Sequence, residues 1–187
     1  FTIDEVETVF HEFGHALHSF MRDVHYTTVG DVERDFVELP SQINEHWAFE
    51  PEVLDIYAKH YKTGEPLPKE LLAKYNAASK YGQGFATTEY LAASYVDMDL
   101  HVLTEVPENF DVMQFEAQKL AERGIPRQIK PRYSVTNFSH TMEGGYTAGY
   151  YSYIWAEVLD ADGFEAFKET GDIFNPEVAE RFRKYVL

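Results

Sequence analysis

The chain has 187 residues, no cysteine and a formal net charge of -16. Such an acidic chain, without a block of Lys and Arg, argues against a nucleic acid or an anionic membrane as its partner. Because cysteine is absent, disulfides, thiolate metal ligands and a cysteine nucleophile are excluded, and any metal site must use His, Asp and Glu.

The length and the apolar content of 44% suffice for one folded domain over residues 1–187. No run approaches the roughly 18 consecutive apolar residues that a membrane span needs, so we expect no membrane partner. No signal peptide is visible, and we expect a cytoplasmic location with the periplasm as the alternative.

The apolar pattern predicts a mainly α fold with at most a short strand pair. Thr2 and Glu5 have the spacing of a capping box, which predicts a first helix from about residue 3 to about residue 22. Residues 25–30 are rich in aromatic and β-branched side chains and predict a short strand or an extended link. Residues 33–50 are predicted to be helical, with Pro40 in a first turn or at a kink.

The remaining chain is also predicted to be helical, with Gly or Pro at two of the breaks. The expected helices are residues 51–64, 69–82, 87–105, 112–124 and 176–186, with another through Trp155 and Leu159. A Gly-rich and Tyr-rich stretch, residues 144–153, leads into that helix. No repeat or long linker divides the chain.

Residues 11–15, with the sequence HEFGH, predict a metal site. His11 and His15 lie four residues apart, on one face of a helix, so both imidazoles can bind one ion. Glu12 is placed to accept a proton from a water at that ion. The alternative is a helix with surface histidines. Gly14 argues against it, because a glycine inside a helix costs about 1 kcal/mol and suggests a close approach by another segment.

A catalytic zinc needs three protein ligands and one open position. A third histidine at the spacing HExxHxxGxxH is excluded, because residue 18 is His and residue 21 is Met. A downstream carboxylate is therefore expected, and Asp35 and Glu38 are candidates. Their spacing allows one to bind the metal and the other to hold a histidine N–H, and it leaves the choice open. His18 lies on the same helix face, but a fourth ligand there would close the open position.

Three segments in order, FHEFGHALH, RDFVELPSQINEHW and HTMEGGYTAGYYSYIW, resemble the thimet oligopeptidase family of zinc metallopeptidases, and most of all its peptidyl-dipeptidase Dcp branch. The resemblance implies a multi-helix, zincin-like catalytic core and one Zn²⁺ per chain. It assigns the third zinc position to Glu38, which leaves Asp35 as a supporting residue behind a ligand. Family members are several times longer, so the chain is expected to be one catalytic-core fragment whose preceding N-terminal part is missing.

Residues 139–155 concentrate hydrogen-bond donors suited to an oxyanion. The resemblance maps substrate-facing roles onto His140, Tyr146 and Tyr153. Tyr150 is a further candidate for substrate binding, although an aromatic core is an equally good explanation for it. Arg132, or else Arg127, is a candidate for holding a substrate's terminal carboxylate, because a guanidinium binds carboxylates bidentately.

We therefore expect a zinc metallopeptidase that acts on short peptides and releases dipeptides from a free C-terminus. Endo-acting cleavage by the same chemistry is the alternative. Cobalt or manganese would also suit such an N/O site. A second hypothesis is a metal-binding helical module with little catalysis, and a third is an acidic scaffold without metal, which measurement of zinc content would distinguish.

Overall fold

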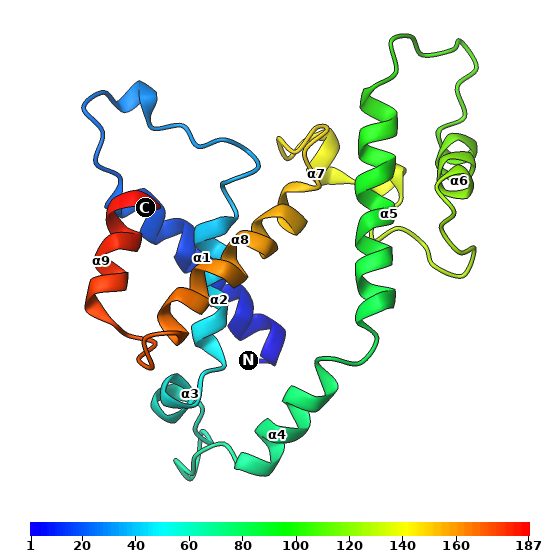
Figure 1. Cartoon of the computed structure of the whole chain (residues 1–187). Coiled ribbons are helices and arrows are strands. Elements are labelled where there is room, and N and C mark those ends of the chain that lie inside the picture. Colours follow the sequence, from blue (N-terminus) through cyan, green and yellow to red (C-terminus); the bar gives the residue numbers. More distant parts are fainter. The chain divides into compact units, whose positions relative to one another are not determined.

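The computed structural model describes residues 1–187 and consists of helices joined by loops, without a β-sheet (Figure 1). Its only strand-like pairing is an isolated antiparallel bridge between Lys59 and Pro66. The mainly α prediction is thus confirmed. None of the helices combines the length and apolar character required to cross a membrane.

The chain divides into two compact units. Unit 1 comprises Phe1–Lys69 together with Ser152–Leu187, and unit 2 comprises Glu70–Tyr151. Each unit is defined by contacts among its own residues. The expectation of one catalytic core over residues 1–187 stays a prediction.

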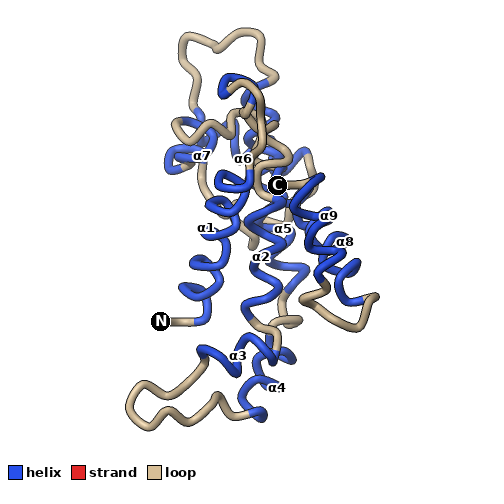
Figure 2. Tube along the Cα trace, turned by 90° about the vertical axis from the view of Figure 1, so that its left-hand side faces the viewer, coloured by secondary structure: helices blue, strands red, loops and turns tan.

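Unit 1 contains five α-helices and one 3₁₀ turn. These are α1 (Ile3–Met21), η1 (Thr27–Val29), α2 (Leu39–Ala48), α3 (Pro51–Tyr57), α8 (Ser152–Lys168) and α9 (Pro176–Tyr185). Figure 2 labels these helices along the Cα trace. Helix α2 packs against α1 and against α8. Apolar residues from α2 and α8, including Ile43, Ala156 and Phe164, form the buried core where these helices meet.

Unit 2 is organised around its longest helix, α5, which packs against α6 and η2. Its elements are α4 (Lys69–Ala78), whose first residue falls in unit 1, α5 (Gln83–His101), α6 (Val112–Glu122), η2 (Val135–Asn137) and α7 (Ser139–Met142). The predicted helices over residues 51–64 and 69–82 end earlier than expected. The helix predicted over residues 87–105 lies one turn closer to the N-terminus.

Local signals placed the first helix correctly. The backbone N–H of Thr2 donates to a Glu5 carboxylate oxygen at 2.7 Å, and the Glu5 N–H donates to the Thr2 hydroxyl at 3.2 Å. This reciprocal capping satisfies two N–H groups that a helix start otherwise leaves open. The predicted helix of about residues 3–22 is confirmed to within one residue.

Two predictions for this part of the chain need correction, although Pro40 lies in a first turn as expected. Residues 25–30 form no strand; they contain the 3₁₀ turn η1, in which the Val29 N–H donates to the Tyr26 carbonyl at 3.1 Å. The helix predicted from residue 33 begins only at Leu39. Pro40 lacks an N–H and cannot continue a helical ladder from the preceding turn, so the helix begins with this proline in its first turn.

Gly14 marks a close approach of α1 to the start of α2, as its position inside a helix predicts. A Cβ atom at residue 14 would lie 2.6 Å from Ser41 Cα and even closer to the Pro40 carbonyl oxygen. Only a glycine allows two backbones to approach so closely. This contact sets the distance between the helix that carries the two histidines and the helix that begins beside Glu38.

Candidate metal centre

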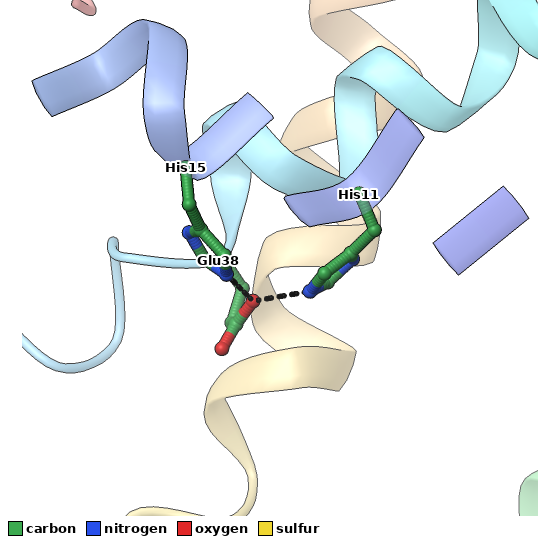
Figure 3. Close-up of side chains that lie close together, drawn as sticks. All are labelled: His11, His15 and Glu38. Atoms are coloured by element: carbon green, nitrogen blue, oxygen red, sulfur yellow. Dashed lines mark ion pairs between the residues drawn. The ribbon is translucent and has the colours of Figure 1, made fainter. Parts of the chain in front are cut away.

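His11, His15 and Glu38 form a cluster in unit 1. The histidines lie one turn apart on α1, and their ring centroids are 4.9 Å apart. Glu38 is the residue immediately before α2, and its carboxylate points toward both rings (Figure 3). One oxygen, Oε2, lies 3.2 Å from His11 Nε2 and 3.3 Å from His15 Nε2.

This donor set fits a zinc ion. Ligand atoms about 2.0–2.1 Å from a tetrahedral zinc are separated by roughly 3.4 Å, close to both measured distances between nitrogen and oxygen. All three ligand atoms lie within 4.8 Å of one another. Two imidazoles and one carboxylate also leave the fourth position open, as a catalytic site requires.

Glu38 is buried, with 2% of its surface exposed, and Ser41 holds its side chain in place. The Ser41 hydroxyl lies 2.8 Å from Glu38 Oε2 and 2.9 Å from the Glu38 backbone carbonyl. Ser41 is itself completely buried. A buried carboxylate is costly unless it is paired and hydrogen-bonded, and Ser41 supplies one such bond from within the same turn.

Glu45 is a functional candidate that the sequence analysis missed. Its Oε1 atom lies 2.5 Å from His11 Nδ1, the ring nitrogen on the side away from Glu38. Burial acts to lower the pKa of His11, but hydrogen bonds and charge from Glu38 and Glu45 outweigh it and raise that pKa to about 10. A carboxylate behind a metal-binding histidine fixes the ring's orientation.

One signal for Glu45 is present in the sequence, because it follows Glu38 by seven residues, or two helical turns. Both residues therefore face the same side of α2. Asp35 lies half-buried in the turn before α2, and its supporting role stays a prediction.

Glu12 and His18 complete the list of candidates on α1. Glu12 is exposed, one residue after His11. His18 lies outside the three-residue metal cluster and stands edge-on to Phe36, with ring centroids 6.4 Å apart. Burial and the neighbouring charges of His15 and Arg22 lower the pKa of His18. The fourth position of the cluster is not filled by a protein ligand.

Tyr153 lies in the first turn of α8 and is half-buried. The Gln42 amide from α2 donates to the Tyr153 backbone carbonyl at 3.2 Å and lies 3.3 Å from Asp160. Asp160, buried in α8, also contacts His46 Nε2 at 2.6 Å. These polar contacts tie the helix that carries Tyr153 to the helix that follows Glu38.

The other predicted substrate residues lie in unit 2. His140 belongs to α7, and Tyr146 follows in the loop after it, where its N–H donates to the His140 carbonyl at 3.0 Å. The two rings are 6.2 Å apart. Tyr146 is 9% exposed and His140 is half-buried. Their roles toward a substrate stay predictions.

Tyr150 and Arg132 belong to an aromatic cluster in unit 2. Tyr150 is 2% exposed and stacks on Tyr90 with ring centroids 4.8 Å apart, a contact that suits the aromatic-core alternative. Burial raises the pKa of its phenol. The exposed Arg132 places its guanidinium carbon 5.4 Å from the Tyr90 ring centroid. Arg127 is exposed as well.

This cluster, on α1 and immediately before α2, could hold a metal ion, and comparison with known proteins gives the family of the chain. Over residues 1–187 the chain matches the family described as peptidase family M3. The chain belongs to peptidase family M3, which confirms the resemblance.

Three relatives illustrate the match. The chain is 44% identical to "Dipeptidyl carboxypeptidase" from Escherichia coli strain K12 over 98% of its own length and 27% of the relative's. Identity to the protein of the same name from Salmonella typhimurium is 42%, with the same coverage. Identity to "Oligopeptidase A" from Escherichia coli strain K12 is 42% over the whole chain and 28% of the relative. The chain thus spans little more than a quarter of the length of these relatives.

Proposed function

We propose that this chain carries the zinc-binding and proton-transfer residues of a metallopeptidase that hydrolyses short peptides. The observation that carries the proposal is the separation of 3.2–3.3 Å between Glu38 Oε2 and the Nε2 atoms of His11 and His15. Membership of peptidase family M3 supports it independently. One Zn²⁺ per chain is the proposed cofactor.

The residues divide the chemistry among them. His11, His15 and Glu38 hold the zinc, which when bound lowers the pKa of a water and polarises the scissile carbonyl. Glu12 accepts a proton from the attacking water and delivers it to the leaving amine. Tyr146, with His140 or Tyr153, donates hydrogen bonds to the oxyanion.

The decisive experiment replaces the proposed proton acceptor in the enzyme at its full natural length. Glu12→Gln keeps the shape of the side chain but removes its basicity, so we expect zinc content to stay at one per chain while kcat falls at least about 100-fold. Asp4→Asn, which alters another exposed acid of α1, is the matched control and should keep its activity. Substantial turnover in a pure, zinc-loaded Glu12→Gln protein would reject the role of Glu12.

For the direction of cleavage, we propose release of dipeptides from a free C-terminus, with endo-acting cleavage as the alternative. Relatives named "Dipeptidyl carboxypeptidase" and "Oligopeptidase A" match this chain at nearly equal identity, 44% and 42%, so identity alone does not choose between the two. Mass spectrometry of products from one oligopeptide with a free C-terminus and one with a blocked C-terminus separates the two. Dipeptides formed only from the free peptide support the first option, and equal internal cleavage of both peptides supports the second.

The 187 residues taken alone have a second candidate function, metal binding with little catalysis, because they span only about 27% of the length of the relatives. Specific activity per bound zinc should then be far lower for these residues than for the full-length protein. Equal activities would eliminate this candidate. The cytoplasmic location stays a prediction.

A further inference from the structure

The segment from Ser139 to Tyr151 is held by a buried acid from another helix. Asp97 lies on α5 with 1% of its surface exposed. Its two carboxylate oxygens accept hydrogen bonds from the Ala148 N–H at 3.0 Å and the Tyr150 N–H at 3.0 Å. The Thr141 hydroxyl donates to Asp97 as well. A buried carboxylate must be paired or fully hydrogen-bonded. Residues of one loop supply three hydrogen bonds to Asp97, and His101 Nδ1 on the same helix as Asp97 lies 3.0 Å from its Oδ1.

The positions of these bonds are informative. Thr141 is adjacent to His140, while Ala148 and Tyr150 follow Tyr146 by two and four residues. Asp97 therefore binds the loop next to His140 and again shortly after Tyr146, the two proposed oxyanion donors of this loop. The loop's own bonds are local, such as the Thr147 hydroxyl to the Thr141 carbonyl at 2.8 Å. None of these local bonds ties the loop to a rigid element, whereas Asp97 belongs to a helix of 19 residues.

The backbone conformation of Ala148 is a reason for the loop to require the hydrogen bonds to Asp97. Its φ of 52° is the only positive value at a residue other than glycine, and L-residues avoid this left-handed region because Cβ crowds the backbone. Such a conformation persists only when its surroundings enforce it. The N–H of this same residue donates to Asp97, so the hydrogen bond opposes relaxation of the strained backbone.

We propose that Asp97 is a positioning residue, which fixes the conformation of residues 141–150 and thereby the placement of His140 and Tyr146 for catalysis. This inference rests on the proposed function for the catalytic part of its claim. Asp97 contacts neither substrate nor metal ligand in this scheme and acts through the loop. In Asp97→Asn the side-chain amide has one acceptor oxygen in place of two. Its NH₂ group would face loop groups that are themselves donors, so at least one hydrogen bond to the loop would be lost.

Asp97→Asn in the full-length, zinc-loaded enzyme tests the proposal. We expect kcat to fall about 10- to 100-fold, in line with the effect of small misplacements of catalytic groups, with little change in KM and one zinc per chain. Amide exchange at Ala148 and Tyr150, measured without substrate, should quicken at least about tenfold. Asp99→Asn is the matched control, because Asp99 on the same helix pairs with Arg123 at 2.6 Å. This control should keep kcat and the slow exchange of both amides.

Thr141→Val provides a milder second variant, which removes one donor to Asp97 while its volume stays nearly the same. Should Asp97→Asn fail to fold, a fall in kcat of a fewfold in Thr141→Val, with faster exchange at Ala148, supports the proposal. Unchanged exchange in the variants, or an equal loss of kcat in Asp99→Asn, overturns it, as does fast exchange with normal kcat. An unsubstituted protein that cleaves no peptide would refute the proposed function instead, and the exchange measurement would still judge whether Asp97 orders the loop.

Discussion

Ser41 supports the third metal ligand through one hydroxyl group. Its bond to Glu38 Oε2, at 2.8 Å, keeps that carboxylate beside both imidazoles. Residues that orient metal ligands typically contribute 10–100-fold to metal affinity, so Ser41→Ala should weaken zinc binding by about that factor. Competition with a chelator of known affinity measures the change.

Ser94→Ala is the matched control, because the Ser94 hydroxyl is also buried and bonds a backbone carbonyl, that of Tyr90 at 3.2 Å. It lies in unit 2 and touches no metal ligand, so zinc affinity should stay within about twofold of the unsubstituted value. A similar loss in both variants would mean that Ser41 acts through general stability rather than through Glu38.

His11 makes zinc binding depend on pH. Its pKa of about 10 in the metal-free protein means that a proton occupies the ring at neutral pH and must leave when the metal binds. Since protons compete with zinc, affinity should rise with pH, by about tenfold per pH unit where His11 is protonated, and level off near pH 10. Titration calorimetry at pH 8 in buffers of different ionisation enthalpy should detect about one proton released per zinc.

Glu45→Gln supplies the comparison for this measurement. Removing the charge at 2.5 Å from Nδ1 lowers the His11 pKa, so fewer protons should be released at pH 8 to 9. The same proton count in both proteins would contradict a contribution of Glu45, beside that of Glu38, to the raised pKa of His11.

At the scale of single residues, the sequence predicted what local spacing can encode. His11 and His15 follow from their four-residue helical spacing, and Glu12 from its place beside His11 in the HEFGH segment. Glu38 could not be predicted from spacing, because spacing made Asp35 and Glu38 equally good candidates for the third ligand. Only the family resemblance favoured Glu38. Glu45 was missed because its function depends on the crossing of α1 and α2, a contact between residues 34 positions apart.

Gly14 is where two elements meet, and its substitution tests their packing. In Gly14→Ala the new methyl group would press on the backbone of Pro40 and Ser41, which cannot swing aside as a flexible side chain can. We expect a loss of about 1–3 kcal/mol in the free energy of unfolding, together with weaker zinc binding as α2 moves away. Urea denaturation of the metal-free protein measures the first effect.

Gly84→Ala serves as the control, because nothing lies within 4 Å of a Cβ atom at that helical position in α5. Alanine there reduces the freedom of the unfolded chain and should stabilise the protein by about 0.4–1 kcal/mol. A comparable loss in the free energy of unfolding for both variants would show that the close approach of the two backbones is not the reason for a glycine at residue 14.

At the scale of elements, predictions succeeded where the start signal lies within the helix itself. The capping box of Thr2 and Glu5 placed α1, and the segment predicted over residues 176–186 matches α9 (Pro176–Tyr185). Failures came where a proline or a missing partner overrode local preference. Residues 33–38 are predicted to be helical, yet α2 begins only at Leu39, with Pro40 in its first turn. Residues 25–30 have a strand-like composition but no neighbouring strand to pair with.

For the whole molecule, the division into two units makes a prediction about where zinc acts. All three ligands lie in unit 1, on α1 and immediately before α2, whereas α5 and α6 belong to unit 2. A ligand stabilises the structure that binds it, by about 2.7 kcal/mol at a free concentration of one hundred times Kd. Zinc should therefore slow exchange of the most protected amides of α2 by about 100-fold and leave those of α5 nearly unchanged. His15→Ala, which removes one ligand, should abolish the effect in α2. Equal slowing in α2 and α5 would instead mean that both units unfold together, as the single catalytic core expected from the sequence requires.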